Sequence, residues 1–379
     1  MHFAFLLYKF FPYGGMQRDF LRFAEESHQL GHRIRVYCIF WEGEVPSYLE
    51  LRKVPVKAWR NHRRNEKYYR WVLADLQQDP VDGVVGFNKM PGLDVYYAAD
   101  SCYLDKSLKE RGSLYRRGGR FRHFRDYENA VFGPTSSSEI LLISETEKKK
   151  FVEHYHTSEM RMHMLPPGIS MDRRAPHNSE EVRQRVRTKL NLDDGHMLML
   201  FIGSGFIKKG LARVIRAIAD LQNERQASCI LMVIGQDKNA RYRNLAKKMG
   251  IGENVQFLGG RDDIPELLLA ADMMIHPALD EAAGIVLLEA IVAGLPVVVT
   301  DVCGYAHHIG RADAGEVLAS PFSQAALNRA VKDSFNIDRR RQWQKNALKY
   351  AEQEDLHSMH ETGAKIIEGI IRNKQRVGP

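Results

Sequence analysis

The sequence has no apolar run that approaches the roughly 20 residues needed for a membrane-spanning helix. Its start, MHFAFLLYKFFPYGG, is too short and too aromatic for a secretory signal, and it fits a buried strand that runs into a glycine turn. The shares of apolar residues, 44%, and of charged residues, 27%, are ordinary for a globular protein. We therefore expect a cytoplasmic protein without a transmembrane segment.

Cysteine is scarce, and the four cysteines at positions 38, 102, 229 and 303 include no C-x-x-C pair. This spacing indicates neither a zinc site nor a disulfide framework. The glycine-containing segment GSGFIKKG (203–210) lacks the G-K-[ST] ending of a P-loop and the third glycine of G-x-G-x-x-G. The segment therefore supports neither an ATPase nor a dehydrogenase.

Acidic residues are outnumbered, and the formal net charge is +8 with an isoelectric point of about 9.2. Such a chain favours acidic partners, namely phosphate esters, anionic lipid or nucleic acid. The excess is concentrated in two runs, 52–70 and 106–125, each with eight Lys or Arg residues against one acid. Because no motif for binding duplex or single-stranded nucleic acid accompanies them, we expect no nucleic-acid partner.

The length of 379 residues predicts two domains. In the second half, apolar runs of strand length alternate with stretches of helical period, which predicts a parallel, doubly wound α/β sheet. The first half repeats the pattern, from a strand at 2–8 to a strand that turns into a helix at Ser144. The strand-length runs of the second half are 197–203, 229–235, 254–259, 273–278 and 295–300.

The connector LPPGIS (165–170) excludes helix and is the predicted domain boundary. We place the N-terminal domain at 1–166 and the C-terminal domain at 167–350. The tail, 351–379, has isoleucines on one helical face, so we expect it to pack back on the N-terminal domain. These isoleucines are Ile366, Ile367, Ile370 and Ile371.

Two loops have the composition of phosphate sites. Gly14 and Gly15 lie between the first strand and a helix, where backbone N–H groups can approach an anion. An ordinary turn is the structural alternative there. Lys208 and Lys209 follow the first strand of the second half and suit a diphosphate, whereas a solvated surface pair is the simpler explanation of the two lysines alone.

Residues 280–290, DEAAGIVLLEA, contain the carboxylates Glu281 and Glu289 with only small or aliphatic side chains between them. A buried carboxylate is costly unless it is paired or hydrogen-bonded. We place Glu281 in a loop after a strand that ends near His276, and Glu289 about one turn inside a helix that starts around Gly284. Both would then accept hydrogen bonds from a ligand rich in hydroxyl groups, such as a sugar and a ribose, at the carboxyl ends of the strands. The alternative puts both carboxylates at solvated helix ends.

Glu281 and Glu289 with seven residues between them, followed by AIVAGLPVV (290–298), resemble the signature of the family 4 retaining glycosyltransferases. That family has the GT-B fold, in which two Rossmann-like doubly wound domains face a cleft. The glycine loop, PPGIS-x-D-R ending at Arg173, Lys209 and a C-terminal helix stand where the family has them.

Two further segments, 14–20 and 86–103, are similar to the lipopolysaccharide core glucosyltransferases that act on an inner-core heptose. The resemblance implies a UDP-sugar-dependent hexosyltransferase with a donor of the UDP-glucose type and no cofactor besides that substrate. Glu289 would hold the ribose hydroxyls and Glu281 the hydroxyls of the transferred sugar. The residues implied at the donor are Gly15, Arg173, Lys208, Lys209, Glu281, Gly284, Ile285 and Glu289.

Two departures from the family pattern leave alternatives open. Lys208 stands where relatives often have arginine, which removes a bidentate phosphate contact. Leu279 and Asp280 beside the sugar site differ from the pattern of a glucose enzyme. A donor such as UDP-GlcNAc or UDP-GalNAc is therefore an alternative, and a non-catalytic sugar-nucleotide-binding protein is an alternative of another class.

The family is thought to retain configuration by attack on the face from which UDP leaves. Lys209 and Arg173 would stabilise the departing diphosphate in place of a metal, and the chain contains no metal-binding D-x-D tripeptide. Asp100 would orient the acceptor, with a helix N-cap as its structural alternative. The implied catalytic set is Asp100, Lys209 and Glu281, and the acceptor-side candidates are Asp19, Asn88 and Lys89.

An acceptor carried on lipid A would bring the enzyme to the cytoplasmic face of the inner membrane of a Gram-negative bacterium. In the run 106–125, basic side chains would meet anionic headgroups while aromatic rings sit at the interface. Gly112 and the pair Gly118 and Gly119 predict a short helix followed by a loop, and a solvated loop that binds acceptor phosphates is the alternative. The residues expected at the membrane are Lys106, Lys109, Arg111, Tyr115, Arg116, Arg117, Arg120, Phe121, Arg122, Phe124 and Arg125.

Overall fold

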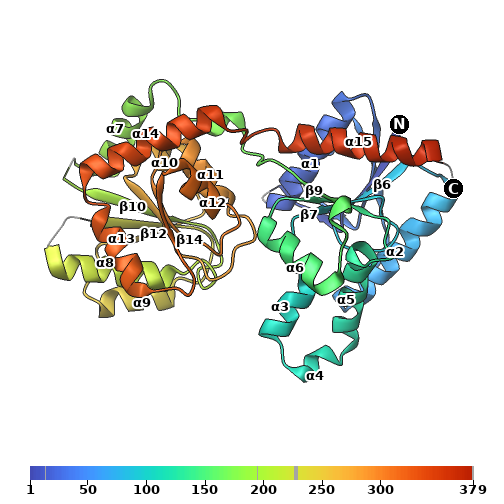
Figure 1. Ribbon diagram of the computed structural model, residues 1–379, viewed down its shortest axis with the longest axis horizontal. Helices are drawn as coiled ribbons and strands as arrows, with labels where there is room; N and C mark the ends of the chain where they lie inside the picture. The colour runs from blue at the N-terminus through green and yellow to red at the C-terminus, as the bar shows by residue number, and fades with distance from the viewer. Residues whose placement is uncertain (13, 194, 226–228, 378–379) are drawn as a thin grey trace. The chain divides into compact units, whose positions relative to one another are not determined.

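The computed structural model describes residues 1–12, 14–193, 195–225 and 229–377, which form two compact units (Figure 1). The first unit comprises Met1–Gly168 together with Ser358–Pro379, and the second comprises Ile169–His357. The chain leaves the first unit after Gly168, inside the predicted connector 165–170 and two residues beyond the predicted boundary at position 166, and it returns before the last helix.

The sheet of the first unit has seven parallel strands in the order β5-β3-β1-β6-β7-β8-β9. A separate parallel pair joins β2 (Lys9–Phe10) to β4 (Phe40–Trp41). The strands of the large sheet are β1 (His2–Leu6), β3 (Arg33–Cys38), β5 (Leu49–Lys53), β6 (Gly83–Gly86), β7 (Val95–Ala98), β8 (Glu139–Leu142) and β9 (Met162–Met164).

Helices cover both faces of this sheet because side chains alternate along each strand. Phe3 and Phe5 of β1 share one core with α1 (Gly15–Gln29) and α15 (Met359–Val377). Ala4 and Leu6 share the other core with α2 (Asn61–Gln78), α5 (Gly119–Phe132) and α6 (Glu145–Tyr155). These helices therefore bury one apolar side each.

Two local predictions are confirmed in the first unit. Ser144 caps α6, and its hydroxyl accepts a hydrogen bond from the backbone N–H of Glu147. The isoleucine face of α15 packs into the core that contains α1, where Ile367 and Ile371 are fully buried and their neighbours are half-buried.

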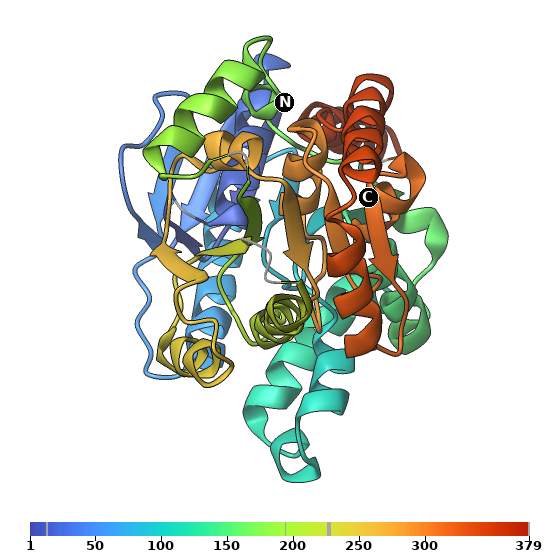
Figure 2. The same cartoon turned by 90° about the vertical axis from the view of Figure 1, so that its left-hand side faces the viewer.

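The second unit, seen in Figure 2, has six parallel strands in the order β12-β11-β10-β13-β14-β15. They are β10 (Met197–Ile202), β11 (Cys229–Ile234), β12 (Val255–Gly259), β13 (Met273–His276), β14 (Val297–Thr300) and β15 (Gly315–Leu318). The helices of this unit are α7 (Ser179–Lys189), α8 (Leu211–Arg225), α9 (Ala240–Lys248), α10 (Ile264–Ala270), α11 (Ile285–Val292), α12 (Ala306–Ala312), α13 (Gln324–Asp333) and α14 (Ile337–Gln353).

Both units are Rossmann-like, so the predicted doubly wound α/β architecture is confirmed. In the second unit α7, α10, α11, α12 and α14 cover one sheet face, and α8, α9 and α13 cover the other. The strand order reverses at β10, which lies between β11 and β13. Ligands of open α/β sheets bind at such a switch point, outside the carboxyl ends of the strands.

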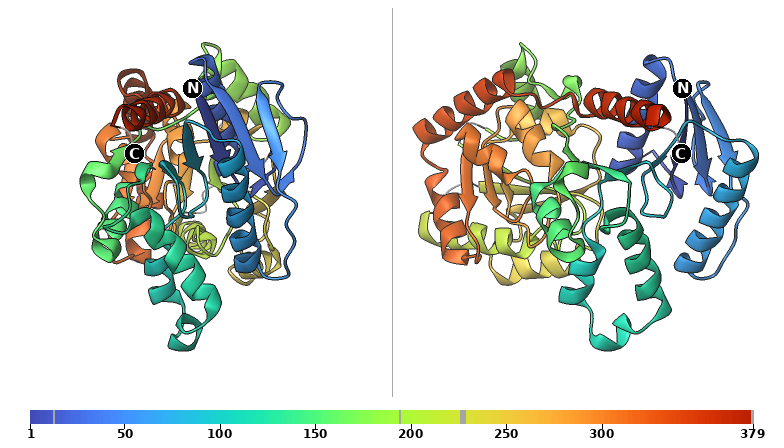
Figure 3. Two further views of the ribbon diagram at one scale, coloured as in Figure 1. Left: turned by 90° about the vertical axis from the view of Figure 1, so that its right-hand side faces the viewer. Right: turned by 45° about the vertical axis from the view of Figure 1, so that its right-hand side comes forward.

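Three helices separate β7 from β8 in the first unit (Figure 3). They are α3 (Tyr103–Glu110), α4 (Ser113–Arg116) and α5, and we call them the α3–α5 segment. The predicted interruptions at Gly112 and Gly118 are confirmed, since each of these glycines caps the next helix. The predicted loop after the first helix is wrong, because those residues form α4 and α5, with α4 at the far end (Figures 1 and 3).

A buried carboxylate fastens the base of the α3–α5 segment. Glu128, in α5, is fully buried and accepts hydrogen bonds from the backbone N–H groups of Tyr103 at 2.8 Å and Leu104 at 2.9 Å. The Tyr155 hydroxyl donates to it at 2.6 Å, and Nζ of Lys89 lies 2.6 Å from its other oxygen. Because a buried charge requires such partners, Glu128 fixes the start of α3 to α5 and α6.

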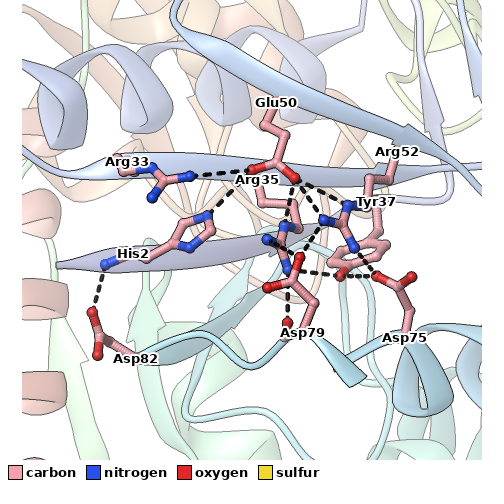
Figure 4. A network of polar contacts seen from close by, with 9 residues as sticks. All are labelled: His2, Arg33, Arg35, Tyr37, Glu50, Arg52, Asp75, Asp79 and Asp82. Atoms are coloured by element: carbon pink, nitrogen blue, oxygen red, sulfur yellow. Dashed lines mark hydrogen bonds and ion pairs between the residues drawn. The ribbon is translucent and has the colours of Figure 1, made fainter. Parts of the chain in front are cut away.

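A network of charges ties the outer strands of the first sheet to α2 (Figure 4). Arg35, almost fully buried, donates to Glu50 at 2.9 Å and to Asp79 at 2.6 Å. Arg52 donates to Asp75 at 2.5 Å and also pairs with Asp79. Arg52 therefore has a structural role, although it is the first residue of the basic run 52–70.

Among the residues that the structure describes, none of the helices combines the length and the apolar character needed to cross a bilayer.

Candidate active site

The loops that follow β10 and β13 lie side by side because the two strands are neighbours in the sheet. The backbone N–H of Leu279 donates a 2.6 Å hydrogen bond to the carbonyl of Lys208. Gly210, with φ of +78°, ends the first loop, and a Cβ there would stand 2.1 Å from the carbonyl oxygen of Pro277. Only glycine permits this approach, so the sequence fixes the contact between the two loops.

Lys209 and Glu281 form an ion pair across these loops, between Nζ and Oε2. Both are largely buried, with side chains 21% and 14% exposed. Burial lowers the pKa of Lys209, and Lys208 lowers it further, whereas Cys303 and Asp280 act in the opposite direction. We interpreted the two carboxylates of the motif as left for a ligand, but the carboxylate of Glu281 has a protein partner in this structure.

His276 completes a cluster of three ionisable groups with Lys209 and Glu281. It ends β13, is only 1% exposed, and holds Nε2 at 3.5 Å from Oε2 of Glu281. Burial, and then the neighbouring charge of Lys209, lowers the pKa of His276 to about 3, so the imidazole is neutral near pH 7. Within the described residues neither ring nitrogen has a hydrogen-bond partner. The sequence analysis did not predict His276 as a site residue. A polar residue at the end of an apolar strand could have indicated it, because such strand ends face the ligand site of an open α/β sheet.

The second carboxylate, Glu289, lies on α11, where the predicted helix start is confirmed. Gly284 is the N-cap, with φ of +85°, and the helix begins at Ile285. The first N–H groups of a helix lack intrahelical acceptors, so this end of α11 presents donors and a positive dipole. Glu289 is half-buried, one turn into α11. A Cβ at position 284 would stand 3.3 Å from Cγ of Glu281, which places the loop carboxylate against the helix start.

The two remaining basic residues of the donor set lie on the same unit. Lys208 is half-exposed, and its Nζ lies 3.6 Å from Oδ2 of Asp280. Arg173 is half-buried at the end of a short 3-10 helix, Met171–Arg173. Two residues later, the backbone N–H of Ala175 donates to the carbonyl of Val292, at the end of α11. The structure thus brings Lys209 and Glu281 into contact and attaches the Arg173 segment to the far end of the helix that carries Glu289.

The predicted glycine loop and Asp100 belong to the first unit. Gly15 is the first residue of α1, and a Cβ on it would meet no atom within 4 Å, so packing does not demand glycine there. Asp100 is exposed just beyond β7. The alternative role of a helix cap does not hold for Asp100, because the N-cap of α3 is Cys102.

The three acceptor-side candidates all have partners within the first unit. Asp19 accepts from the Tyr97 hydroxyl at 2.8 Å, and its other oxygen lies 3.0 Å from Nε2 of His360. Asn88 accepts from the backbone N–H of Tyr8 at 2.8 Å. Lys89 is bound to Glu128, as described above. These contacts give each residue a structural role.

The aromatic residues expected at a membrane mostly pack against one another. Phe121 is buried, 6% exposed, with its ring centroid 6.0 Å from that of Tyr103. Phe124 lies 5.4 Å from the same ring, and the hydroxyls of Tyr115 and Tyr103 are 3.0 Å apart. Phe121 is thus unavailable to a lipid surface, because α3 and α5 close over it. The exposed apolar side chain at the far end is Leu114, at 84%.

The basic residues of the α3–α5 segment differ in exposure. Lys109 is exposed but pairs with Asp105 at 3.0 Å, and Arg125 with Asp126 at 2.7 Å. Lys106 and Arg116 are half-buried. The remaining ones are exposed, namely Arg111, Arg117, Arg120 and Arg122.

The described part of the chain contains no group of three or more His, Cys, Asp or Glu side chains that could hold a metal ion.

Comparisons with known proteins agree with this geometry. Residues 182–350, which include the loops after β10 and β13, match the family model described as glycosyl transferases group 1. The chain is 47% identical over 367 residues to the lipopolysaccharide glucosyltransferase WaaG of Escherichia coli (strain K12), which covers 97% of this chain and 98% of that protein. The crystal structure of WaaG, at the same identity, has a TM-score of 0.88 over 97% of this chain and 100% of that one. Anabaena HepE in complex with UDP and glucose, 16% identical, has a TM-score of 0.72 over 97% of this chain and 100% of its own, which shows a common fold. The chain therefore belongs to the group 1 glycosyltransferases and has their GT-B fold.

Proposed function

We propose that this enzyme transfers glucose from UDP-glucose to a heptose of the lipopolysaccharide inner core, with retention of configuration. The observation that carries the proposal is the Lys209–Glu281 pair at the switch point of the second unit, in a chain 47% identical to a lipopolysaccharide glucosyltransferase. A switch point is where open α/β sheets bind nucleotides, and a cation beside a carboxylate suits a diphosphate joined to a sugar.

Donor binding exchanges the partners of this pair. The diphosphate binds Nζ of Lys209 in place of Glu281, because an anion with several oxygens accepts strong charge-assisted hydrogen bonds. Glu281 is then released to accept hydrogen bonds from hydroxyls of the transferred sugar, while Glu289 holds the ribose. Arg173, Lys208 and the start of α11, at Gly284 and Ile285, complete the anion site.

In the reaction, an acceptor hydroxyl oxygen forms a bond to the anomeric carbon as the bond from that carbon to the UDP oxygen breaks. Attack from the face that UDP leaves retains the configuration, and the acceptor proton passes to the departing diphosphate. Lys209 and Arg173 stabilise the charge that develops on the diphosphate. The reaction therefore needs neither a metal nor a cofactor.

The acceptor is anchored in the cytoplasmic leaflet of the inner membrane, so the enzyme works there as a peripheral protein. The α3–α5 segment attaches it, through Leu114 and the exposed arginines near the far end. Changing Arg116, Arg117, Arg120 and Arg122 to Ser should reduce flotation with phosphatidylglycerol vesicles. Neither the parent nor the variant should float with neutral vesicles. Equal flotation of the parent and the variant would contradict this attachment.

The experiment that tests the function supplies purified protein with UDP-glucose and lipopolysaccharide truncated after the inner-core heptoses. UDP release that depends on acceptor, and an α-linked product from the α-linked donor, are the expected results. Parallel assays with UDP-galactose, UDP-GlcNAc and UDP-GalNAc decide the donor. Turnover with an N-acetylhexosamine alone would establish the alternative donor, and absence of turnover with every donor would favour a non-catalytic sugar-nucleotide-binding protein.

A further inference from the structure

The basic run 52–70 carries an exposed aromatic residue, Trp59, that the donor site does not use. Trp59 precedes α2, and its exposed fraction is 105% of the reference value. Tryptophan is usually buried, because its ring contributes a large apolar area. The other tryptophans of this chain, at positions 41, 71 and 343, are buried or half-buried. Trp59 is therefore a candidate contact residue.

Basic side chains without acidic partners surround Trp59 in sequence. Residues 57–70 contain six Lys or Arg residues and one acid, Glu66. The carboxylate of Glu66 forms ion pairs with Arg63 at 3.4 Å and with Arg70 at 2.6 Å. In the described part of the chain the other four have no carboxylate partner, and these are Lys57, Arg60, Arg64 and Lys67.

The start of α2 packs against the α3–α5 segment. The ring of His62 lies 6.0 Å from that of His123, and Tyr69 lies 6.1 Å from Tyr127. The two helices therefore run in the same direction, with the start of α2 beside the early part of α5. Burial, and then the charges of Arg63, Arg60 and Arg120, lowers the pKa of His62, which agrees with a common positive surface.

We propose that Trp59 and the basic start of α2 form a second membrane contact, which binds the anionic headgroup region together with the far end of the α3–α5 segment. The inference rests on the membrane attachment in the proposed function and extends it to a separate element. An indole with an apolar body and a polar N–H prefers the headgroup level of a bilayer. Arg and Lys side chains around it meet the negative lipid surface.

Charge and ring geometry favour lipid over nucleic acid at this surface. Proteins that bind single strands stack successive bases on several aromatic rings. Here the nearby rings of His62 and Tyr69 are used in packing against α5, so Trp59 is left as a single exposed ring. One ring among unpaired cations suits insertion at an interface better than a row of stacked bases.

Tryptophan fluorescence tests the contact directly. Vesicles that contain phosphatidylglycerol should shift the emission to shorter wavelength, and brominated phosphatidylglycerol should quench it. Phosphatidylcholine vesicles should do neither. In Trp59→Phe the vesicle-dependent change should disappear, since the remaining tryptophans are buried or half-buried. The same response in Trp59→Phe as in the parent would overturn the proposal.

A charge variant tests the basic residues. Changing Lys57, Arg60, Arg64 and Lys67 to Gln should lower the vesicle partition coefficient by on the order of 10³-fold, about fivefold for each residue. A matched control removes four exposed lysines of the second unit that have no acidic partner in the described residues. They are Lys247, Lys248, Lys345 and Lys349, and their change to Gln should leave partition within about twofold of the parent.

Three measurements separate this inference from the proposed function. Thermal stabilisation by UDP, measured for every variant, reports folding and the donor site. If the α2 variants partition like the parent while the four-arginine variant of the α3–α5 segment does not, the second contact is wrong and the proposed attachment stands. If the α2 variants lose binding to an RNA or DNA duplex and vesicles leave the Trp59 spectrum unchanged, the surface binds nucleic acid and the inference is overturned.

Discussion

The Nε2 atom of His276 lies 3.5 Å from Oε2 of Glu281, and burial keeps the imidazole neutral. A neutral imidazole can donate one N–H to a carboxylate without adding a charge to the site. His276 therefore suits the task of holding Glu281 in place when Lys209 turns to the diphosphate. The short sequence distance between the two residues, across one loop, makes the arrangement independent of the first unit.

We expect His276→Phe to lower kcat for glucose transfer by about 10-fold to 10²-fold. The change removes the hydrogen bond that His276 can donate to Glu281 once the donor has displaced Lys209, and a hydrogen bond to a charged group contributes about 1.5–3 kcal/mol. KM for UDP-glucose should change much less, since the contact acts on the reacting sugar. His276→Asn, which keeps a donor, should recover part of the loss. An equal fall in both variants, or a loss of UDP binding, would show that His276 acts only through packing.

Lys209→Ala should reduce kcat by on the order of 10²-fold or more, because it removes a charge-assisted contact to the leaving group. Glu281→Gln should also lower transfer, through weaker binding of the sugar hydroxyls. Lys247→Ala, at an exposed site on α9, is the control for loss of one positive charge. Near-normal turnover of Lys209→Ala or Glu281→Gln would refute the donor-site assignment.

The alkaline limit of activity should follow the charge on Lys209. The pKa of this buried lysine is below its usual value, so its ammonium form is present at lower pH and is lost as the pH rises through that value. Asp280 raises the pKa, so Asp280→Asn should move the alkaline limb of the kcat/KM profile, which reports groups of the free enzyme, to lower pH. Lys208 lowers it, so Lys208→Gln should move the limb to higher pH. Shifts in the same direction, or no shifts, would exclude Lys209 as the titrating group.

Glucose transfer should be unchanged in excess EDTA, because Lys209, Arg173 and the start of α11 supply the positive potential that a divalent ion would otherwise give. Initial rates with and without chelator measure this. A loss that manganese or magnesium restores would overturn metal independence.

Lys89→Met should destabilise the first unit by about 3 kcal/mol or more, because it leaves the buried Glu128 carboxylate without its cation. The free energy of unfolding from denaturant titration measures the effect. Lys149→Met, at an exposed position of α6, is the matched control and should change stability by no more than about 0.5 kcal/mol. Unchanged stability of Lys89→Met would contradict the structural role of Lys89 and would leave it as a candidate for binding the acceptor.

Local patterns in the sequence determined the parallel strands, the helix start at Gly284, the cap at Ser144 and the interruptions at Gly112 and Gly118. Each depends on neighbours within a few residues, through side-chain alternation, helical period or the freedom of glycine. The segment that contains Glu281 and Glu289 was also predicted correctly as a strand, a loop and a helix.

Only the tertiary structure decided which charges meet. The Lys209–Glu281 pair depends on β10 and β13 becoming neighbours, although 70 residues lie between the end of β10 and the start of β13. In the same way Lys89 was assigned to Glu128, Phe121 was buried against α3, and the start of α2, just after Trp59, was placed beside the α3–α5 segment. A residue type specifies the charge or the ring that a position offers, but burial and partner depend on strand order and helix packing, which join segments that no local pattern connects.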